Sequence, residues 1–253
     1  MRLAFKGGIW KINKFTEADK LFRKFQIDKF DKKRISPGVS LSIDIDVTEL
    51  NKIRKKLNKK ITLTHVLLNV ISKNLSDYNT LYACFNGKKI IYNPELVINV
   101  PVDIENHVEY VILRNPEKYN LEELANQFNF ELDKIKRGEG SFKNYLKTVM
   151  KVPRIIRKFA LKIPGFDSKF MREHYGNFVV TNIGKLNMKS ATMTVMKPII
   201  SSIIIGKTKE INSKEMLPMT LFFDHRAVDA GHVSRFLSSV KKQMENPKDI
   251  FTS

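Results

Sequence analysis

One histidine of this chain lies in a setting typical of a catalytic base. His225 follows an apolar run at residues 221–223 and precedes a pattern that predicts a helix, and the carboxylate of Asp229 comes four residues later. An imidazole titrates near neutral pH, so it can take a proton from a nucleophile and return it to a leaving group. The residue types and their spacing therefore indicate general acid–base chemistry.

Two other interpretations of the same residues remain open. A lone histidine beside apolar residues is often structural, and Asp229 could pair with an arginine or fix the turn. His225, Asp229 and His232 could also suggest a metal site. A strand–turn–helix crossing does not keep these three on one face, and no second cluster joins them, so we expect no metal.

The hydrophobic pattern predicts the elements that must position these residues. Period-two or apolar runs predict strands at 39–47, 81–85, 89–92, 96–102, 108–113, 177–181, 191–196, 199–205 and 219–223. Helical spacing predicts helices that begin at Thr48, at Thr62 or Thr64, at Asn120 and near Gly231; the third ends at Gly138. The pattern predicts an α/β fold, an α+β two-layer sandwich in which helices cover a mixed sheet.

Composition limits the class of protein. The 253 residues are 42% hydrophobic, which suits a single globular domain over residues 1–253, and Cys84 is the only cysteine. One thiol excludes an intramolecular disulfide and suits a reducing compartment. The sequence shows no signal peptide and no membrane-spanning apolar run, so we expect a soluble, cytoplasmic protein.

Basic residues are in large excess. The chain has 45 Lys and Arg against 26 Asp and Glu, a net charge of +19. This field attracts polyanions or a phosphate-bearing cofactor without choosing among them. Residues 141–175 are the least regular part and hold nine Lys and Arg against two Asp and Glu, with aliphatic and aromatic residues interleaved. We interpret them as an insert that packs on the protein's own assembly or docks on an acidic carrier protein or an anionic membrane surface; without a recognised binding motif, nucleic acid is not expected.

Several ordered motifs resemble one known family. The segment 224–231, Asp-His-Arg-Ala-Val-Asp-Ala-Gly, resembles the His-x-x-x-Asp-Gly signature of the chloramphenicol acetyltransferase-like acyltransferases. Residues 40–58, 178–184 and 198–206 resemble the first strand and helix, the Ser/Thr-Asn-x-Gly turn and the next apolar strand of the dihydrolipoamide acyltransferases of 2-oxo acid dehydrogenase complexes. The similarity covers about residues 39–246.

The resemblance implies a chloramphenicol acetyltransferase-like fold and a homotrimer with each active site between two subunits. It also implies the site residues: His225 matches the general base, Thr181 the residue that stabilises the oxyanion, and Asp229 an orienting carboxylate. Coenzyme A or acyl-coenzyme A would be the substrate, and the acceptor a thiol, hydroxyl or amine. The resemblance assigns no residues to coenzyme A binding.

Three departures from the family pattern shape the expected function. Ala230 replaces the motif glycine, and alanine tolerates a positive φ poorly. The insert at 141–175 is longer than usual, and no lipoyl or subunit-binding domain is recognised. We therefore expect a stand-alone acyltransferase. The alternatives are a non-catalytic trimeric scaffold and the acyltransferase core of a complex whose lipoyl domain lies on another chain.

Overall fold

The computed structural model describes residues 38–57, 61–86, 89–104, 107–140, 148–160, 175–194 and 198–251. Its strands are β1 (Gly38–Asp46), β2 (Cys84–Phe85), β3 (Ile90–Ile91), β4 (Val97–Ile104), β5 (His107–Arg114), β6 (Phe178–Asn182), β7 (Ser201–Ile205), β8 (Lys209–Ile211) and β9 (Lys214–Asp224). Its α-helices are α2 (Thr48–Leu57), α3 (Leu63–Leu75), α4 (Leu121–Lys136), α6 (Arg154–Ala160) and α8 (Ala230–Glu245). Short 3₁₀ turns are η2 (Asn79–Tyr82), η3 (Pro116–Lys118), η5 (Gly184–Leu186) and η6 (Pro247–Ile250).

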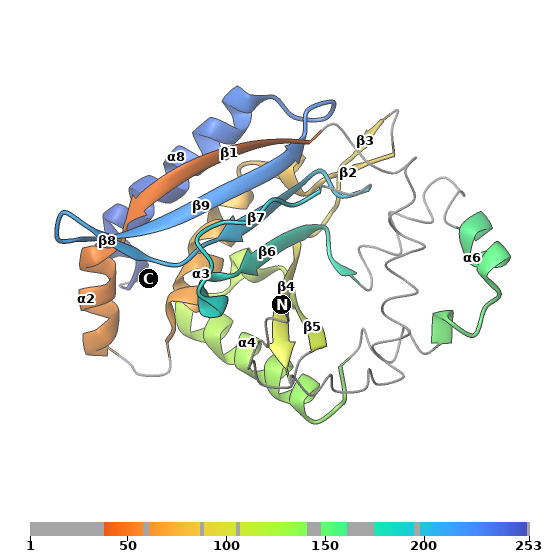
Figure 1. The fold of residues 1–253 in the computed structure, drawn as a ribbon, viewed down its shortest axis with the longest axis horizontal. Helices are drawn as coiled ribbons and strands as arrows, with labels where there is room; N and C mark the ends of the chain where they lie inside the picture. The colour runs from red at the N-terminus through yellow and green to blue at the C-terminus, as the bar shows by residue number, and fades with distance from the viewer. Residues whose placement is uncertain are drawn as a thin grey trace, which may run out of the picture.

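The strands form a mixed sheet in the order β1-β9-β7-β6-β4-β5, with β8 added beside β9 (Figure 1). The two central pairings, β7 with β6 and β6 with β4, are parallel, whereas the outer pairings are antiparallel. Parallel strands need long crossover connections, and the chain supplies them between β4 and β6 and between β6 and β7.

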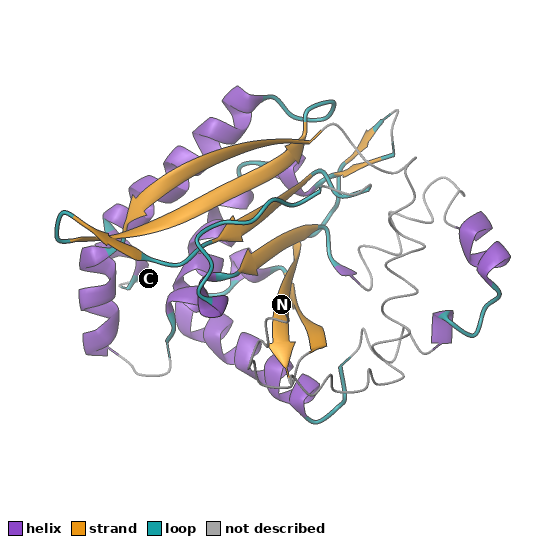
Figure 2. Ribbon diagram, in the orientation of Figure 1, coloured by secondary structure: helices purple, strands orange, loops and turns teal. Residues whose placement is uncertain are grey.

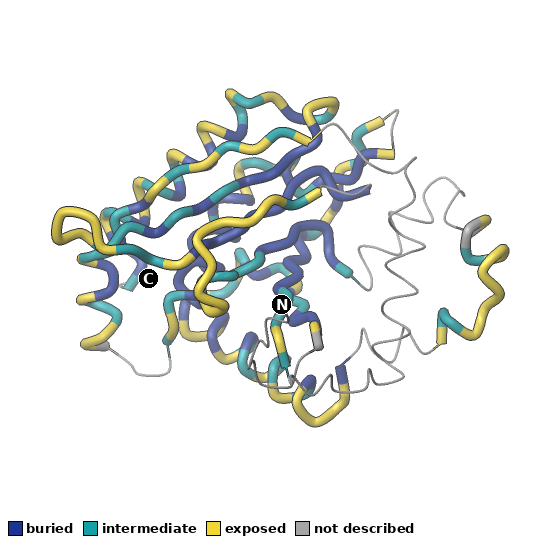
Figure 3. The backbone as a smooth tube through the Cα atoms, viewed as in Figure 1, coloured by how far each residue is buried: buried dark blue, intermediate teal, exposed yellow. Residues whose placement is uncertain are grey.

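Helices α3, α4 and α8 lie together behind the sheet, so that the molecule has two layers (Figures 1 and 2). Alternate residues of the strands, among them Ile98, Phe178, Ile203 and Phe223, are buried against this layer. Helix α3 is buried along nearly its whole length, in keeping with its central place (Figure 3). The predicted mixed sheet covered by helices is confirmed.

Local capping chemistry decides where the helices begin. Thr62, not Thr64, caps α3, and its side chain accepts a hydrogen bond from the amide of His65. Asn120 and Glu123 form the expected capping box of α4. The predicted cap by Thr48 is wrong, because the carboxylate of Asp46 accepts the Thr48 amide and hydroxyl at 3.0 and 2.6 Å.

Three predicted strands differ from the structure. Residues 191–194 form no strand, although they alternate in polarity, and residues 195–197 lie outside the described part of the chain. Only two residues of each predicted strand at 81–85 and 89–92 pair, and Leu81 lies in the turn η2. In contrast, β9 begins five residues earlier than predicted, because a turn at Asn212 and Ser213, both with positive φ, pairs it with β8.

The predicted insert is described only at residues 148–160, which include α6, and at Tyr175. The predictions for the rest of it fall outside the described residues. No helix in the described part of the chain combines the length and apolar character needed to cross a bilayer.

Candidate active site

The end of β9 fixes the turn that carries His225. Asp224, the last residue of the strand, is almost completely buried, and its carboxylate accepts hydrogen bonds from Arg226 Nε at 3.0 Å and Nη2 at 2.7 Å. It also accepts the Arg226 amide at 3.0 Å. The Asp224 carbonyl accepts the amides of Ala227 and Val228. A buried carboxylate with this many charge-assisted bonds holds the turn rigid.

This turn presents His225 at the surface beside Asp229. The His225 side chain is 47% exposed, and its Nδ1 lies 3.9 Å from Asp229 Oδ1. The ring also lies against Phe223, with the centroids 5.7 Å apart. A separation of 3.9 Å is too long for a hydrogen bond, so the two side chains are neighbours without a direct bond. The structure thus brings together two of the three predicted site residues.

Ala230 causes no backbone strain. It is the first residue of α8 and is absent from the set of non-glycine residues with positive φ. Asp229 precedes it in extended conformation as the cap residue, although its side chain makes no capping bond. Alanine is well suited to a helical position. Ala230 therefore fits the backbone at the position of the motif glycine without distorting the turn.

Thr181 lies on β6, and contacts on both sides fix this strand. At its start, a Cβ on Gly176 would lie 2.7 Å from the carbonyl oxygen of Val97, and the Asn177 side chain accepts the Val97 amide at 2.9 Å. After Thr181, the Asn182 side chain donates to Thr64 Oγ1 and accepts the Gly184 amide, each at 3.0 Å. The strand and the following turn are positioned independently of the His225 turn.

The register of the sheet separates Thr181 from His225. Thr181 pairs with Ile204 of β7, and Ile204 pairs with Thr220 of β9. His225 lies five residues beyond Thr220, which amounts to about 16 Å along the sheet, and β6 is two strand spacings, about 10 Å, from β9. The Cα atoms of Thr181 and His225 in one copy are therefore about 19 Å apart, which is too far for both side chains to contact one carbonyl group.

Two other histidines, His65 and His232, have structural surroundings. Burial and the positive charge of Lys185 lower the pKa of His65 to about 4, and its Nδ1 accepts the Thr62 amide. Burial lowers the pKa of His232, whose ring packs against Tyr78. Among the residues that the structure describes, no three His, Cys, Asp or Glu side chains form a group that could hold a metal ion.

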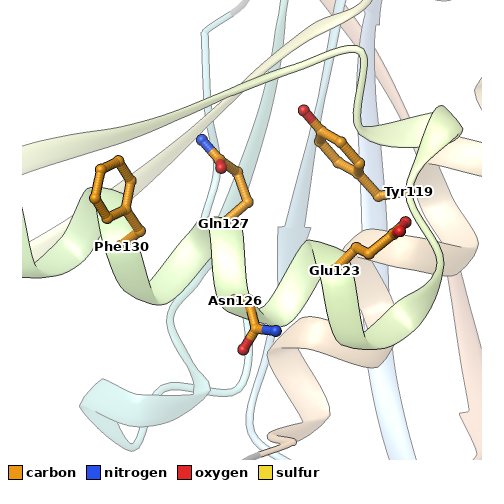
Figure 4. Close-up of a pocket in the computed structure, with 5 residues that line it drawn as sticks. All are labelled: Tyr119, Glu123, Asn126, Gln127 and Phe130. Atoms are coloured by element: carbon orange, nitrogen blue, oxygen red, sulfur yellow. The ribbon is translucent and has the colours of Figure 1, made fainter.

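A shallow pocket of about 530 Å³ lies elsewhere, on the outer side of α4 (Figure 4). It is lined by Tyr119, Glu123, Asn126, Gln127 and Phe130. None of the three predicted site residues borders it. This pocket is therefore separate from the candidate active site.

Sequence reasoning missed three residues that position the site. The Asp224–Arg226 pair stands inside the quoted motif, but only the burial of Asp224 shows that the pair holds the turn. A carboxylate at the end of an apolar strand was the available signal. Thr64, which supports the turn after Thr181 through Asn182, is 118 residues distant in sequence and gave no local signal.

Comparison with known proteins supports the same family. The family model described as "2-oxoacid dehydrogenases acyltransferase (catalytic domain)" matches residues 22–146 and 169–252. A similar curated relative is the dihydrolipoyllysine-residue acetyltransferase component of the acetoin cleaving system of Bacillus subtilis, 23% identical over 228 residues. The match covers 84% of this chain and 50% of that protein, so the chain spans about half the length of this relative.

Two solved structures show the fold. The dihydrolipoamide acetyltransferase of Azotobacter vinelandii superposes with a TM-score of 0.69 at 17% identity, covering 92% of this chain and 91% of that one. A chloramphenicol acetyltransferase superposes with a TM-score of 0.58 at 12% identity, covering 91% and 96%. The predicted chloramphenicol acetyltransferase-like fold is confirmed.

Proposed function

Because the chain belongs to the family of 2-oxoacid dehydrogenases acyltransferase catalytic domains, we propose that it moves an acyl group between coenzyme A and an acceptor thiol, hydroxyl or amine. The turn in which Asp224 and Arg226 hold His225 beside Asp229 carries this proposal. The Azotobacter structure comes from work on the role of a serine, a histidine and an asparagine in the catalytic mechanism of that enzyme. That histidine and that asparagine are four positions apart, as His225 and Asp229 are.

In the proposed reaction His225 is the general base. Its imidazole takes the proton of the acceptor, and the resulting nucleophile attacks the thioester carbonyl of acyl-coenzyme A. The tetrahedral intermediate then breaks its carbon–sulfur bond, and the protonated His225 returns the proton to the sulfur. A positioned base of this kind accelerates a reaction by about 10²–10⁴-fold.

Thr181 is the proposed donor to the oxyanion. Its hydroxyl would donate a hydrogen bond to the negatively charged oxygen of the tetrahedral intermediate, and such a donor is worth about 10²–10³-fold in rate. The distance of about 19 Å between Thr181 and His225 within one copy supports a site formed by two copies of the chain. A homotrimer in which Thr181 of one copy faces His225 of the next satisfies this requirement.

Asp229 is proposed to orient His225 and not to transfer a proton. Its side chain is 90% exposed, so solvent screens its charge, and the 3.9 Å separation allows only an electrostatic influence on the ring. Loss of Asp229 should therefore cost less activity than loss of His225.

Positive charge near Thr181 supports a phosphate-bearing substrate. Lys185, Lys189 and Lys207 are exposed on the turn after β6 and on the segment after β7, and Lys207 donates to the Asn187 side chain. Coenzyme A carries several phosphate charges, which such a field attracts. We propose coenzyme A as a substrate, and a cytoplasmic location remains part of the same proposal.

A second candidate function differs only in the acceptor. The curated relative is named as the dihydrolipoyllysine-residue acetyltransferase component of a cleaving system, which favours a core whose acceptor is a dihydrolipoyl group carried on another chain. A non-catalytic scaffold is less well supported, because Ala230 is unstrained and the chain retains both His225 and Thr181.

The test is thioester release from a panel of acyl-coenzymes A, with dihydrolipoamide and small hydroxyl and amine compounds as alternative acceptors. We expect His225→Ala to abolish turnover and Thr181→Ala to leave trace activity, with coenzyme A binding nearly unchanged. Thr220→Ala is the matched control, since Thr220 is a partly buried strand threonine at the same level of the sheet. Equal, small losses in all three variants would contradict the assignment.

A further inference from the structure

Helix α6 carries the most exposed large apolar side chains of the described part of the chain. Ile155 is 84% exposed and Phe159 is 69% exposed, and Val152 and Ile156 are also exposed. Isolated apolar residues on a surface are ordinary, but these four lie within eight consecutive positions. The cluster therefore requires an explanation.

Helical spacing gathers these residues on one side. Within α6, positions 155, 156 and 159 follow the i, i+1, i+4 spacing of a stripe on one helix side, and Val152 lies in the bend just before the helix begins. The basic residues Lys151, Arg154 and Arg157 lie outside this stripe, and Arg157 Nη1 donates to the carbonyl of Val152 at 2.5 Å. The segment is thus an amphipathic helical turn whose apolar side faces outward.

This segment does not belong to the fold that the family shares. The family model matches residues up to 146 and again from 169, and α6 lies in the unmatched interval 147–168. Figure 1 shows α6 at the side of the molecule, away from the sheet, and Figure 3 shows its exposed surface. Neither the shared core nor the candidate active site accounts for the apolar stripe.

We propose that the α6 segment, residues 151–160, docks on an anionic lipid surface. The unmatched interval contains six Lys and Arg residues and one carboxylate, Asp167, and the whole chain has a net charge of +19. A convex helical turn with an apolar stripe and basic neighbours is the chemistry that inserts shallowly at a headgroup boundary. An acidic protein or a second copy of the chain would need a groove that matches this stripe, whereas a fluid lipid surface does not.

The basic residues and the apolar stripe should contribute to lipid binding in different ways. Each Lys or Arg near an anionic leaflet changes the partition coefficient by about fivefold, and this part weakens with added salt. Each large apolar side chain that enters the boundary contributes about tenfold or more. Binding should therefore need both the apolar stripe and the negative lipid.

The experiment is co-sedimentation of the full chain with vesicles of phosphatidylcholine alone or with about 30% phosphatidylglycerol. We expect binding only to the anionic vesicles, lowered about 100-fold by Ile155→Ser with Phe159→Ser and about 25-fold by Arg154→Gln with Arg157→Gln. Phe130→Ser is the matched control, because Phe130 is 53% exposed on α4, outside the insert. It should bind like the unchanged chain.

Three binding results overturn the proposal, and a fourth comes from the assembly mass: the three are no binding to anionic vesicles, equal loss in the Phe130 control, and equal binding to neutral vesicles. The mass of the assembly, measured by light scattering, is followed in parallel. If the Ile155 and Phe159 substitutions change this mass, the stripe joins copies of the chain and the lipid proposal is wrong. Acyl transfer without vesicles should be the same in all variants, so failure of this proposal is distinct from failure of the proposed function.

Discussion

Mixed assemblies test whether one reaction uses residues from two copies of the chain. One variant carries His225→Ala and the other carries Thr181→Ala, so each copy lacks one of the two proposed groups. The sheet register places the Cα atoms of these two residues about 19 Å apart within a copy, whereas both side chains must come within hydrogen-bond reach of one thioester carbonyl and its nucleophile. A site made by two copies can recover one intact residue from each variant.

The recovered activity follows from the geometry of a closed ring. In a random equal mixture, half of the copies supply an intact His225 and half supply an intact Thr181. About one quarter of the sites then contain both residues, whatever the number of copies in the ring. Since His225→Ala alone loses about 10²-fold or more, the mixture should exceed this variant by about 25-fold or more.

The assay is thioester release after the two variants have been denatured together and refolded, with separately refolded variants as the baseline. A mixture of His225→Ala with a chain that carries both substitutions is the control, because none of its sites can be complete. Recovery of activity in the mixture of His225→Ala with Thr181→Ala, and not in the control mixture, supports the shared site. No recovery in a mixture with the normal assembly mass would refute the reasoning and require both groups to act within one copy.

Four further changes test individual contacts. Asp224→Asn removes a buried charge that holds the turn, so urea denaturation should show a loss of about 1–3 kcal/mol and kcat should fall more than KM rises. Ala230→Gly should leave turnover unchanged and lower the stability by at most about 1 kcal/mol, because the position is helical. Gly206→Ala should cost more than about 2 kcal/mol, because its Cβ would lie 1.9 Å from a backbone carbonyl oxygen, whereas Gly38→Ala, with nothing within 4 Å, should be neutral. The pKa of His65 in the folded chain is about 4, below its ordinary value, so the unfolded chain takes up a proton first as the pH falls. The free energy of unfolding should therefore decrease by about 3 kcal/mol between about pH 6.5 and pH 4. His65→Gln, which preserves the capping box, should lose this slope; an unchanged slope would assign the pH dependence to other groups.

Features with a local cause were predictable from the sequence. The start of α4 at Asn120 and the cap of α3 at Thr62, one of the two threonines that the pattern allowed, depend on side chains that bond to amides three residues away. The strand β1 follows from strict alternation of polar and apolar residues. Each of these structures is specified within one short window of sequence.

Features with a distant cause were not predictable in the same way. Residues 191–194 alternate like a strand, but each central strand already has two neighbours, and these residues pair with none. The support of Asn182 by Thr64 joins residues far apart in the chain. For the site, the motif predicted His225 and Asp229 together, whereas only the register of the sheet revealed how far Thr181 lies from them.

The structure also explains why assembly and chemistry should be linked. The His225 turn is fixed by the buried Asp224, and β6 is fixed by Gly176 and Asn177, so neither proposed reacting group can move toward the other within a copy. Groups held on rigid elements favour catalysis only if the elements themselves meet in the correct geometry. The distance between the two groups in the assembly is then decided by the way in which two copies pack. Helix α6 lies outside the family fold that would set this packing. The insert can therefore acquire a docking role without changing the distance between Thr181 and His225 on which the proposed reaction depends.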